Sequence, residues 1–247
     1  MDKGIIQIRG ESRMNIALLL AAGTDPTFRM NIPKQFVNVY NRPVIVYTME
    51  TFENHPEIDM IAVACLKGWE NMVEAYAKQF GINKLKWVIP GGRTGQETSK
   101  IAVDRLMQEC SSQDIIVIHD AIRPMVSNTV ISDSIYTCKR KGMGVAAVTS
   151  MDNVMMTDDG MTGRLSISRY AFRRIQTPQT YFLGELKKAH EEALEKGIEG
   201  EIDTNNMISR LGRNVNFSKG SDNNLKINTV EDVAMFKALY AMKNGDI

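Results

Sequence analysis

The chain has 247 residues, of which 43% are hydrophobic and 24% charged, so it can bury a substantial core. Its 30 Lys and Arg residues balance 29 Asp and Glu residues, and the net charge of +1 excludes a general electrostatic attraction to nucleic acid or an anionic membrane. No apolar run reaches the roughly 18 residues that span a bilayer, and no signal-peptide segment is recognisable, so we expect a cytoplasmic protein with small-molecule partners.

The three cysteines, Cys65, Cys110 and Cys138, are scattered in apolar or helical context. This pattern fits reduced thiols better than a disulfide framework or a metal site. Residues 1–13 precede the first strand and are interpreted as a leader or an edge strand, and residues 14–247 as one domain.

Strand-like runs alternate with helical patterns through the first half of the chain, which predicts an α/β fold: a parallel sheet with helices on both faces. Ligands of such sheets bind beyond the carboxyl ends of the strands. The expected strands are 16–20, 60–64, 85–88 and 115–119, and the expected helices are 43–51, 69–80 and 98–109.

The alternation fails between about residues 145 and 177, where a polar, Met-rich stretch has Asp158, Asp159 and Gly160 at its middle. This pattern predicts a hairpin arm, at about 147–175, inserted in the domain. Two short strands bury little surface alone, so we expect the arm to pack on another subunit in a homodimer.

Beyond the arm, the patterns predict a helix over 183–196, a polar loop at 201–205, a strand near 215–218 and a last helix over 229–242. Thr229, followed by Glu231 and Asp232, is typical of a capped helix start.

The first strand ends in small residues, Ala21, Ala22 and Gly23, and Lys34 follows after a short loop. A backbone without large side chains can approach a phosphorylated ligand closely, and a lysine supplies a mobile positive charge. This combination indicates a nucleoside triphosphate site, although small residues also occur wherever a strand turns tightly into a helix.

Several further motifs resemble those of the alditol-phosphate cytidylyltransferases in order and spacing. They extend from residue 14 almost to the C-terminus. The motifs are Leu20-Ala21-Ala22-Gly23, Pro33-Lys34-Gln35, Gly91-Gly92, Ile118-His119-Asp120-Ala121-Ile122-Arg123-Pro124, Thr177-Pro178-Gln179 and Leu225-Lys226-Ile227-Asn228.

The resemblance implies a Rossmann-like nucleotidyltransferase sheet whose arm embraces a second protomer. The implied reaction transfers CMP from CTP to a sugar-alcohol phosphate and releases pyrophosphate, with Mg²⁺ bridging the triphosphate. For the acceptor we favour 2-C-methyl-D-erythritol 4-phosphate of isoprenoid synthesis. The alternative acceptor is ribitol 5-phosphate.

The resemblance also implies roles for individual residues. Lys34, Lys226 and Arg29 would act on the phosphates, and Asp120 would hold the metal or the ribose. Asp152, Asn153 and Arg169 would bind the acceptor. The nucleotide would be bound by Leu20, Ala21, Ala22, Gly23, Gly91, Gly92, Thr98, Asp120 and Ala121.

Two side chains near these motifs are interpreted as structural. Arg123 would brace its loop through carboxylate or carbonyl contacts, and His119 would point away from the site by strand alternation.

The chain departs from the family pattern at four places. Asp25 stands where a second loop glycine is usual, Arg93 where an acidic residue is common, Asn153 where threonine is usual, and Ile202 in the late Thr-Asp pair. Two other functions stay open. A hexose-1-phosphate nucleotidyltransferase shares the small-residue loop and the lysine, and the altered loop at Asp25 supports a nucleotide-binding dimer partner without turnover.

Overall fold

The computed structural model describes residues 13–24, 28 and 32–245. The interpretation of residues 1–13 as a leader, and the expected role of Arg29, fall almost entirely outside the described residues, as does Asp25.

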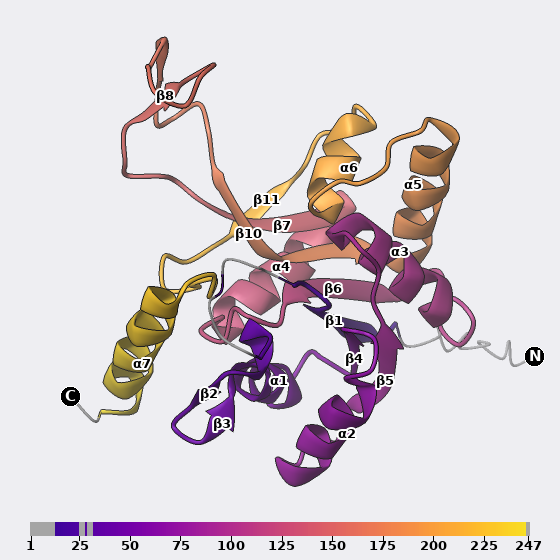
Figure 1. Ribbon diagram of the computed structural model, residues 1–247. Coiled ribbons are helices and arrows are strands. Elements are labelled where there is room, and N and C mark those ends of the chain that lie inside the picture. Colours follow the sequence, from indigo (N-terminus) through magenta and orange to yellow (C-terminus); the bar gives the residue numbers. More distant parts are fainter. Residues whose placement is uncertain (1–12, 25–27, 29–31, 246–247) are drawn as a thin grey trace, which may run out of the picture.

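A seven-stranded sheet forms the centre of the molecule, in the order β11-β7-β10-β6-β1-β4-β5 (Figure 1). Its middle strands pair in parallel, with Ala17 of β1 opposite Ile61 of β4 and Val117 of β6. The strands are β1 (Asn15–Ala21), β4 (Met60–Cys65), β5 (Leu85–Pro90), β6 (Ile115–Asp120), β7 (Met143–Val148), β10 (Arg174–Phe182) and β11 (Phe217–Lys219).

Strand β10, which the sequence patterns did not predict, runs antiparallel to both of its neighbours, β6 and β7. The chain returns from the arm into the sheet on the side where the parallel strands have their carboxyl ends. The first residues of β10 therefore lie beside the last residues of β6, and Gln179 pairs with Ile118.

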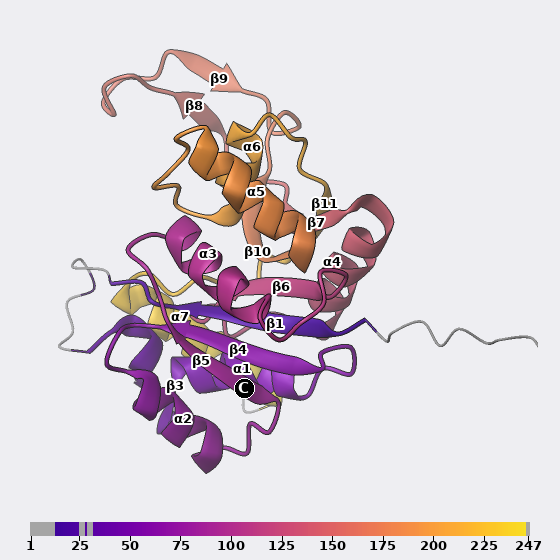
Figure 2. The ribbon, with the colours of Figure 1, turned by 90° about the vertical axis from the view of Figure 1, so that its right-hand side faces the viewer.

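Helices cover both faces of the sheet, as expected (Figure 2). One face carries α1 (Val44–Glu53), α2 (Glu70–Gln79) and α4 (Asn128–Lys141), and the other carries α3 (Gly95–Leu106), α5 (Leu183–Glu195) and α6 (Thr204–Arg210). The sequence patterns did not predict α4, and they placed only a loop where α6 begins.

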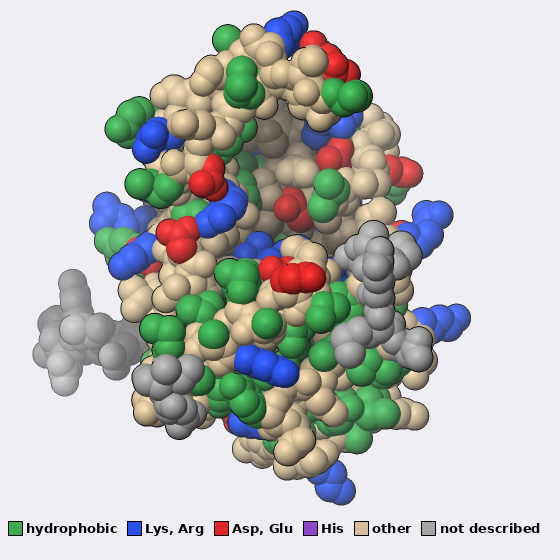
Figure 3. All heavy atoms as spheres, turned by 60° about the vertical axis from the view of Figure 1, so that its left-hand side comes forward, with side chains coloured by type: hydrophobic (Ala, Val, Ile, Leu, Met, Phe, Trp, Pro, Cys, Tyr) green, Lys and Arg blue, Asp and Glu red, His purple; other side chains and the backbone are tan. Residues whose placement is uncertain are grey.

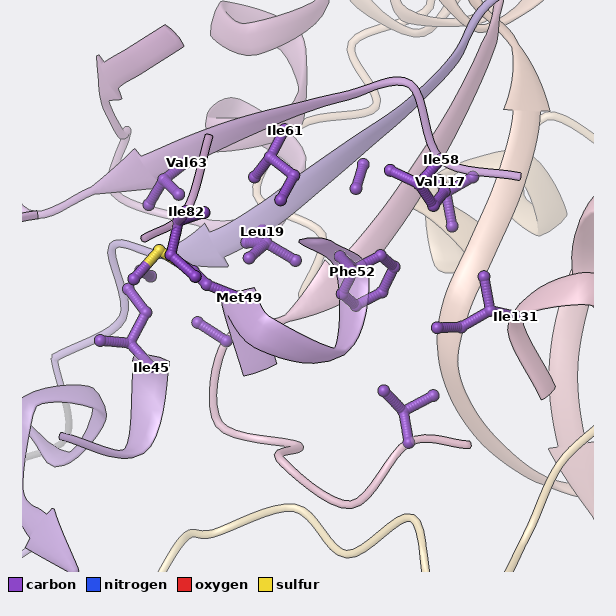
Figure 4. Packing of buried hydrophobic residues seen from close by; sticks show 14 of the residues in the cluster. Leu19, Ile45, Met49, Phe52, Ile58, Ile61, Val63, Ile82, Val117 and Ile131 are labelled. Carbon is purple, nitrogen blue, oxygen red and sulfur yellow. The ribbon is translucent and has the colours of Figure 1, made fainter. Parts of the chain in front are cut away.

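Each face buries the side chains that its strands present with a period of two. Leu19, Ile61 and Val117 meet Met49 and Phe52 of α1 on one face (Figure 4). The alternate strand residues, such as Leu18 and Ile116, meet α3 and α5 on the other face. Because both faces of the middle strands are buried, these strands are nearly continuous apolar runs.

A smaller hydrophobic cluster joins the last helix, α7 (Val230–Asn244), to residues 37–47. Phe236 packs edge-on against Tyr47 of α1, with ring centroids 5.1 Å apart. Thr229 and Asp232 form a capping box, so the expected cap of this helix is confirmed. Between β1 and α1 lie the 3₁₀ helix η1 (Lys34–Phe36) and the short antiparallel strands β2 (Asn38–Val39) and β3 (Arg42–Pro43).

The arm projects from the sheet between β7 and β10, and its hairpin consists of β8 (Val154–Met156) and β9 (Leu165–Ile167) (Figure 2). The inserted hairpin is thus confirmed, although the residues at both ends of the stretch without regular alternation belong to β7 and β10. Among the described residues, no helix is both long and apolar enough to cross a membrane. All three cysteines are free thiols.

Candidate active site

A cavity of about 310 Å³ opens at the carboxyl ends of β1, β5 and β6. The space-filling view shows the surface hollowed beneath the arm, with charged side chains of both signs around the hollow (Figure 3). The residues that line the cavity come from seven separate segments: Leu20–Gly23, Lys34–Gln35, Gly92–Gly95 with Thr98, Ile118–Arg123, Ile175–Gln179, Ile202–Thr204, and Lys226.

The small residues after β1 are held by the side chain of Gln35, which is buried. Its amide nitrogen donates hydrogen bonds to the carbonyl oxygens of Ala21, at 2.7 Å, and Gly23, at 3.4 Å. The neighbouring residue Lys34 is thereby fixed relative to the loop, so the lysine and the small residues face the same cavity.

The glycines after β5 are required by close packing. A side chain at Gly91 would place its Cβ only 2.2 Å from the Cβ of Ala22, so the two loops could not approach as they do. The amide of Gly92 donates to the hydroxyl of Thr98, at 3.1 Å, which ties the second loop to α3.

Asp120, at the end of β6, is the central charge of the cavity. Its Oδ2 accepts a hydrogen bond from Arg123 Nε at 2.9 Å and lies 3.1 Å from Lys226 Nζ. Arg123 also donates to the main-chain oxygen of Asn224, at 2.8 Å. The expected bracing role of Arg123 is therefore confirmed.

Burial by itself would raise the pKa of Asp120, but the positive charges of Lys226 and Arg123 outweigh burial and lower this pKa to about 2. The carboxylate is therefore ionised near neutral pH. His119 is fully buried on the opposite side of β6, and burial lowers its pKa to about 4. It hydrogen-bonds to the carbonyl oxygen of Arg123, so its structural interpretation holds.

The two predicted phosphate-binding lysines lie in one cavity although they are far apart in the sequence. Lys34 Nζ donates to Oδ1 of Asn228, at 3.1 Å, and Asn228 is two residues beyond Lys226. A cavity with two lysine amines and the Arg123 guanidinium suits a polyanionic ligand.

Asp203 lines the same cavity and caps the N-terminus of α6 by accepting from the amide of Asn206. Burial, with a contribution from the nearby Asp120 charge, raises the pKa of Asp203. In the described parts of the chain, no three His, Cys, Asp or Glu residues cluster as a preformed metal site. The two cavity carboxylates suit Mg²⁺, which is usually held by one or two carboxylates together with substrate phosphates and water.

The cavity contains most of the residues predicted for the nucleotide and the phosphates. Ala121 is fully buried beneath the cavity, where its amide donates to the carbonyl of Leu20, and Gly91 lies just behind the wall. Asp152, Asn153 and Arg169 are on the arm and are not among the lining residues of their own chain's cavity. The predicted residues in the lining are Leu20, Ala21, Ala22, Gly23, Lys34, Gly92, Thr98, Asp120 and Lys226.

Several polar lining residues, Asp203 among them, were not predicted as parts of the site. Gln35 clasps the first loop, and Gln176 and Gln179 of β10 line the cavity. Gln35 and Gln179 stand inside the quoted motifs Pro33-Lys34-Gln35 and Thr177-Pro178-Gln179, so their neighbours were the available signal.

The chain matches the 2-C-methyl-D-erythritol 4-phosphate cytidylyltransferase family over residues 15–242. It is 41% identical over 233 residues to a ribitol-5-phosphate cytidylyltransferase of Lacticaseibacillus paracasei, covering 93% of this chain and 99% of the relative. It is 30% identical to a 2-C-methyl-D-erythritol 4-phosphate cytidylyltransferase of Clostridium novyi, covering 91% and 96%.

Solved structures agree with this relationship. The crystal structure of 2-C-methyl-D-erythritol 4-phosphate cytidylyltransferase from Thermus thermophilus has a TM-score of 0.71 and 26% identity, covering 90% of this chain and 97% of that one. The expected Rossmann-like nucleotidyltransferase fold is therefore confirmed.

The Asp120 charge should make folding stability depend on pH in a defined direction. Its folded-state pKa lies below the unfolded value of about 3.9, so its contribution is complete above that value and is lost as the pH falls toward 2. We expect the difference in unfolding free energy between wild type and Asp120→Asn to be largest near neutral pH and to narrow in acid. Urea unfolding of both proteins across this range measures the difference, and a constant difference would contradict the assignment.

Proposed function

The chain belongs to the 2-C-methyl-D-erythritol 4-phosphate cytidylyltransferase family, and we propose that it transfers CMP from CTP to ribitol 5-phosphate and releases pyrophosphate. The main support is the 41% identity, over nearly the whole length, to a protein named ribitol-5-phosphate cytidylyltransferase. The relative named for methylerythritol phosphate is 30% identical, so our initial preference for that acceptor is not supported.

In the proposed reaction, an oxygen of the acceptor phosphate attacks the α-phosphorus of CTP. A new P–O bond forms, the bond to the bridging oxygen breaks, and pyrophosphate leaves with that electron pair. The attacking phosphate is already ionised at neutral pH, so the reaction needs positioning and charge stabilisation more than a general base.

The cavity residues fit this requirement. Lys34 would meet the negative charge that develops on the triphosphate, and Lys226, held at Asp120, would orient a phosphate beside it. The loops at Gly23 and Gly92 bring main-chain groups close to the nucleotide. When bound, Mg²⁺ would neutralise triphosphate charge, and Asp120 and Asp203 are the carboxylates that would hold it.

An acceptor panel tests the proposed function directly. We expect pyrophosphate release with CTP, Mg²⁺ and ribitol 5-phosphate, and much lower kcat/KM with 2-C-methyl-D-erythritol 4-phosphate. ATP, GTP and UTP with the same acceptors, and glucose 1-phosphate as an acceptor, test the hexose-1-phosphate alternative. CTP binding by calorimetry without pyrophosphate release for any acceptor would instead support the dimer partner without turnover.

Two substitutions should separate the chemistry from acceptor binding. Lys34→Ala should lower kcat by about 100-fold or more, because an electrostatic contact to the reacting phosphate is lost. Arg169→Ala should mainly raise the KM for the acceptor. Lys188→Ala, on the exposed surface of α5, is the matched control and should behave as wild type. Equal turnover of Lys34→Ala and wild type would contradict the role of Lys34.

We also propose that the arm packs on a second copy of the chain to form a homodimer. Large apolar side chains of the arm are exposed, including Met161 at 90%, Tyr170 at 82% and Leu165 at 57%. A hairpin of two three-residue strands has little core of its own, so such side chains indicate a partner surface.

Analytical ultracentrifugation tests this assembly. We expect a dimer for wild type and a monomer for the double variant Met161→Asp with Leu165→Asp. Met72→Asp, which places the same charge on an exposed methionine of α2, should leave the dimer intact. A monomeric wild type would refute the proposal.

A further inference from the structure

Lys226 lies in a segment without regular secondary structure, between β11 and α7, so side-chain and loop contacts must fix its position. Two hydrogen bonds join this segment to the loop after β6. Ile227 donates its amide to the carbonyl of Ile122, at 2.9 Å, and Arg123 donates to the carbonyl of Asn224, at 2.8 Å. The lysine is therefore flanked by contacts on both sides.

The side chain of Asn224 joins the same segment to β10. Asn224 is fully buried, and its Nδ2 donates to the carbonyl oxygen of Thr177, at 2.7 Å, and to Oε1 of Gln176, at 3.4 Å. Gln176 in turn makes a reciprocal pair with the main chain of Ser221. Its Nε2 donates to the Ser221 carbonyl at 2.8 Å, and its Oε1 accepts from the Ser221 amide at 3.1 Å.

One feature of Asn224 is unfavourable for stability. Its Oδ1 is buried and has no hydrogen-bond partner among the described residues. A buried acceptor without a partner destabilises a fold, and an apolar side chain of similar size would avoid that cost. The contacts that its Nδ2 makes therefore explain why asparagine is suited to this position.

We propose that Asn224 and Gln176 are positioning residues that hold Lys226 at Asp120 and so at the phosphate cavity. This inference rests on the proposed function and adds to it the residues on which the placement of Lys226 depends. The two side chains connect the start of β10 to the segment of Lys226. The Arg123 side chain connects the same segment to the loop after β6.

The contacts also tie Lys226 to the root of the arm. Gln176 lies near the start of β10, where the chain returns from the arm, and Arg174, two residues earlier, forms an ion pair with Asp222. Loss of either positioning residue would release the segment from β10 and let Lys226 shift. A displacement of about 1 Å at a reacting group can lower the rate by about 100-fold.

A double-mutant cycle tests whether Asn224 acts through Lys226. We expect Asn224→Leu to lower kcat/KM for ribitol 5-phosphate by about 10- to 100-fold in the wild-type background. In the Lys226→Ala background the same change should have little effect, because the amine that Asn224 positions is already absent. Independent effects that multiply would overturn the proposal. Gln176→Met, a neutral change of similar length, provides a second variant for the same cycle.

Asn15→Leu is the matched control. Asn15 is also buried, its Nδ2 donates to a carbonyl oxygen, that of Glu57, at 2.6 Å, and its Oδ1 also has no partner among the described residues. It is the first residue of β1, at the end of the strand opposite to the cavity. The control should lose stability as Asn224→Leu does but keep the wild-type kcat/KM.

Hydrogen exchange followed by mass spectrometry gives a readout that does not depend on activity. Amides of residues 221–227 should exchange faster in Asn224→Leu and Gln176→Met than in wild type or Asn15→Leu. Unchanged exchange in this segment would overturn the proposal. If wild type transfers CMP to no polyol phosphate, the proposed function fails, and the exchange data still decide whether these side chains hold the segment.

Discussion

The cavity depends on one carboxylate oxygen, Oδ2 of Asp120, on which two cations from different segments converge. Burial disfavours an ionised carboxylate, and the Lys226 and Arg123 charges reverse that preference. In return, the carboxylate holds both cations in fixed positions at the edge of the sheet. The three groups together carry a net positive charge, so the cavity remains suited to an anionic ligand. The carboxylate also offsets the repulsion between the two cations.

Chain topology explains why the arm and the cavity share residues. β7 runs parallel to β6 and β10 runs antiparallel to both, so β7 ends and β10 begins at the edge where the cavity lies. The arm therefore leaves and re-enters the sheet at the functional edge. Ile175, Gln176 and Thr177 line the cavity and also form the root of the arm. A parallel strand in the place of β10 would have presented its other end to this edge.

The sequence predicted the parts of the fold and the site that depend on local patterns. Apolar runs located β1, β4 and β6, and small residues and lysines in short motifs located the cavity. Strand β10 was not predicted, and its direction depends on the path of the chain through the arm. Helix α6 was missed because its seven residues are too few for a clear period. Gln35, Gln176 and Asn224 bond mainly to main-chain groups of distant segments, and only the fold shows where those groups are.

With the proposed residue roles, the arrangement would separate the transfer chemistry from acceptor selection. Lys34, Asp120 and Lys226 line the cavity, whereas the predicted acceptor residues Asp152, Asn153 and Arg169 lie on the arm and outside their own chain's cavity. In the proposed dimer, a second copy would supply such residues. A change on the arm could then alter the polyol that is accepted without disturbing the cations that act on the triphosphate. The resemblance described above has threonine at the position of Asn153 on the arm and lysines at Lys34 and Lys226, which is compatible with the proposed division of roles.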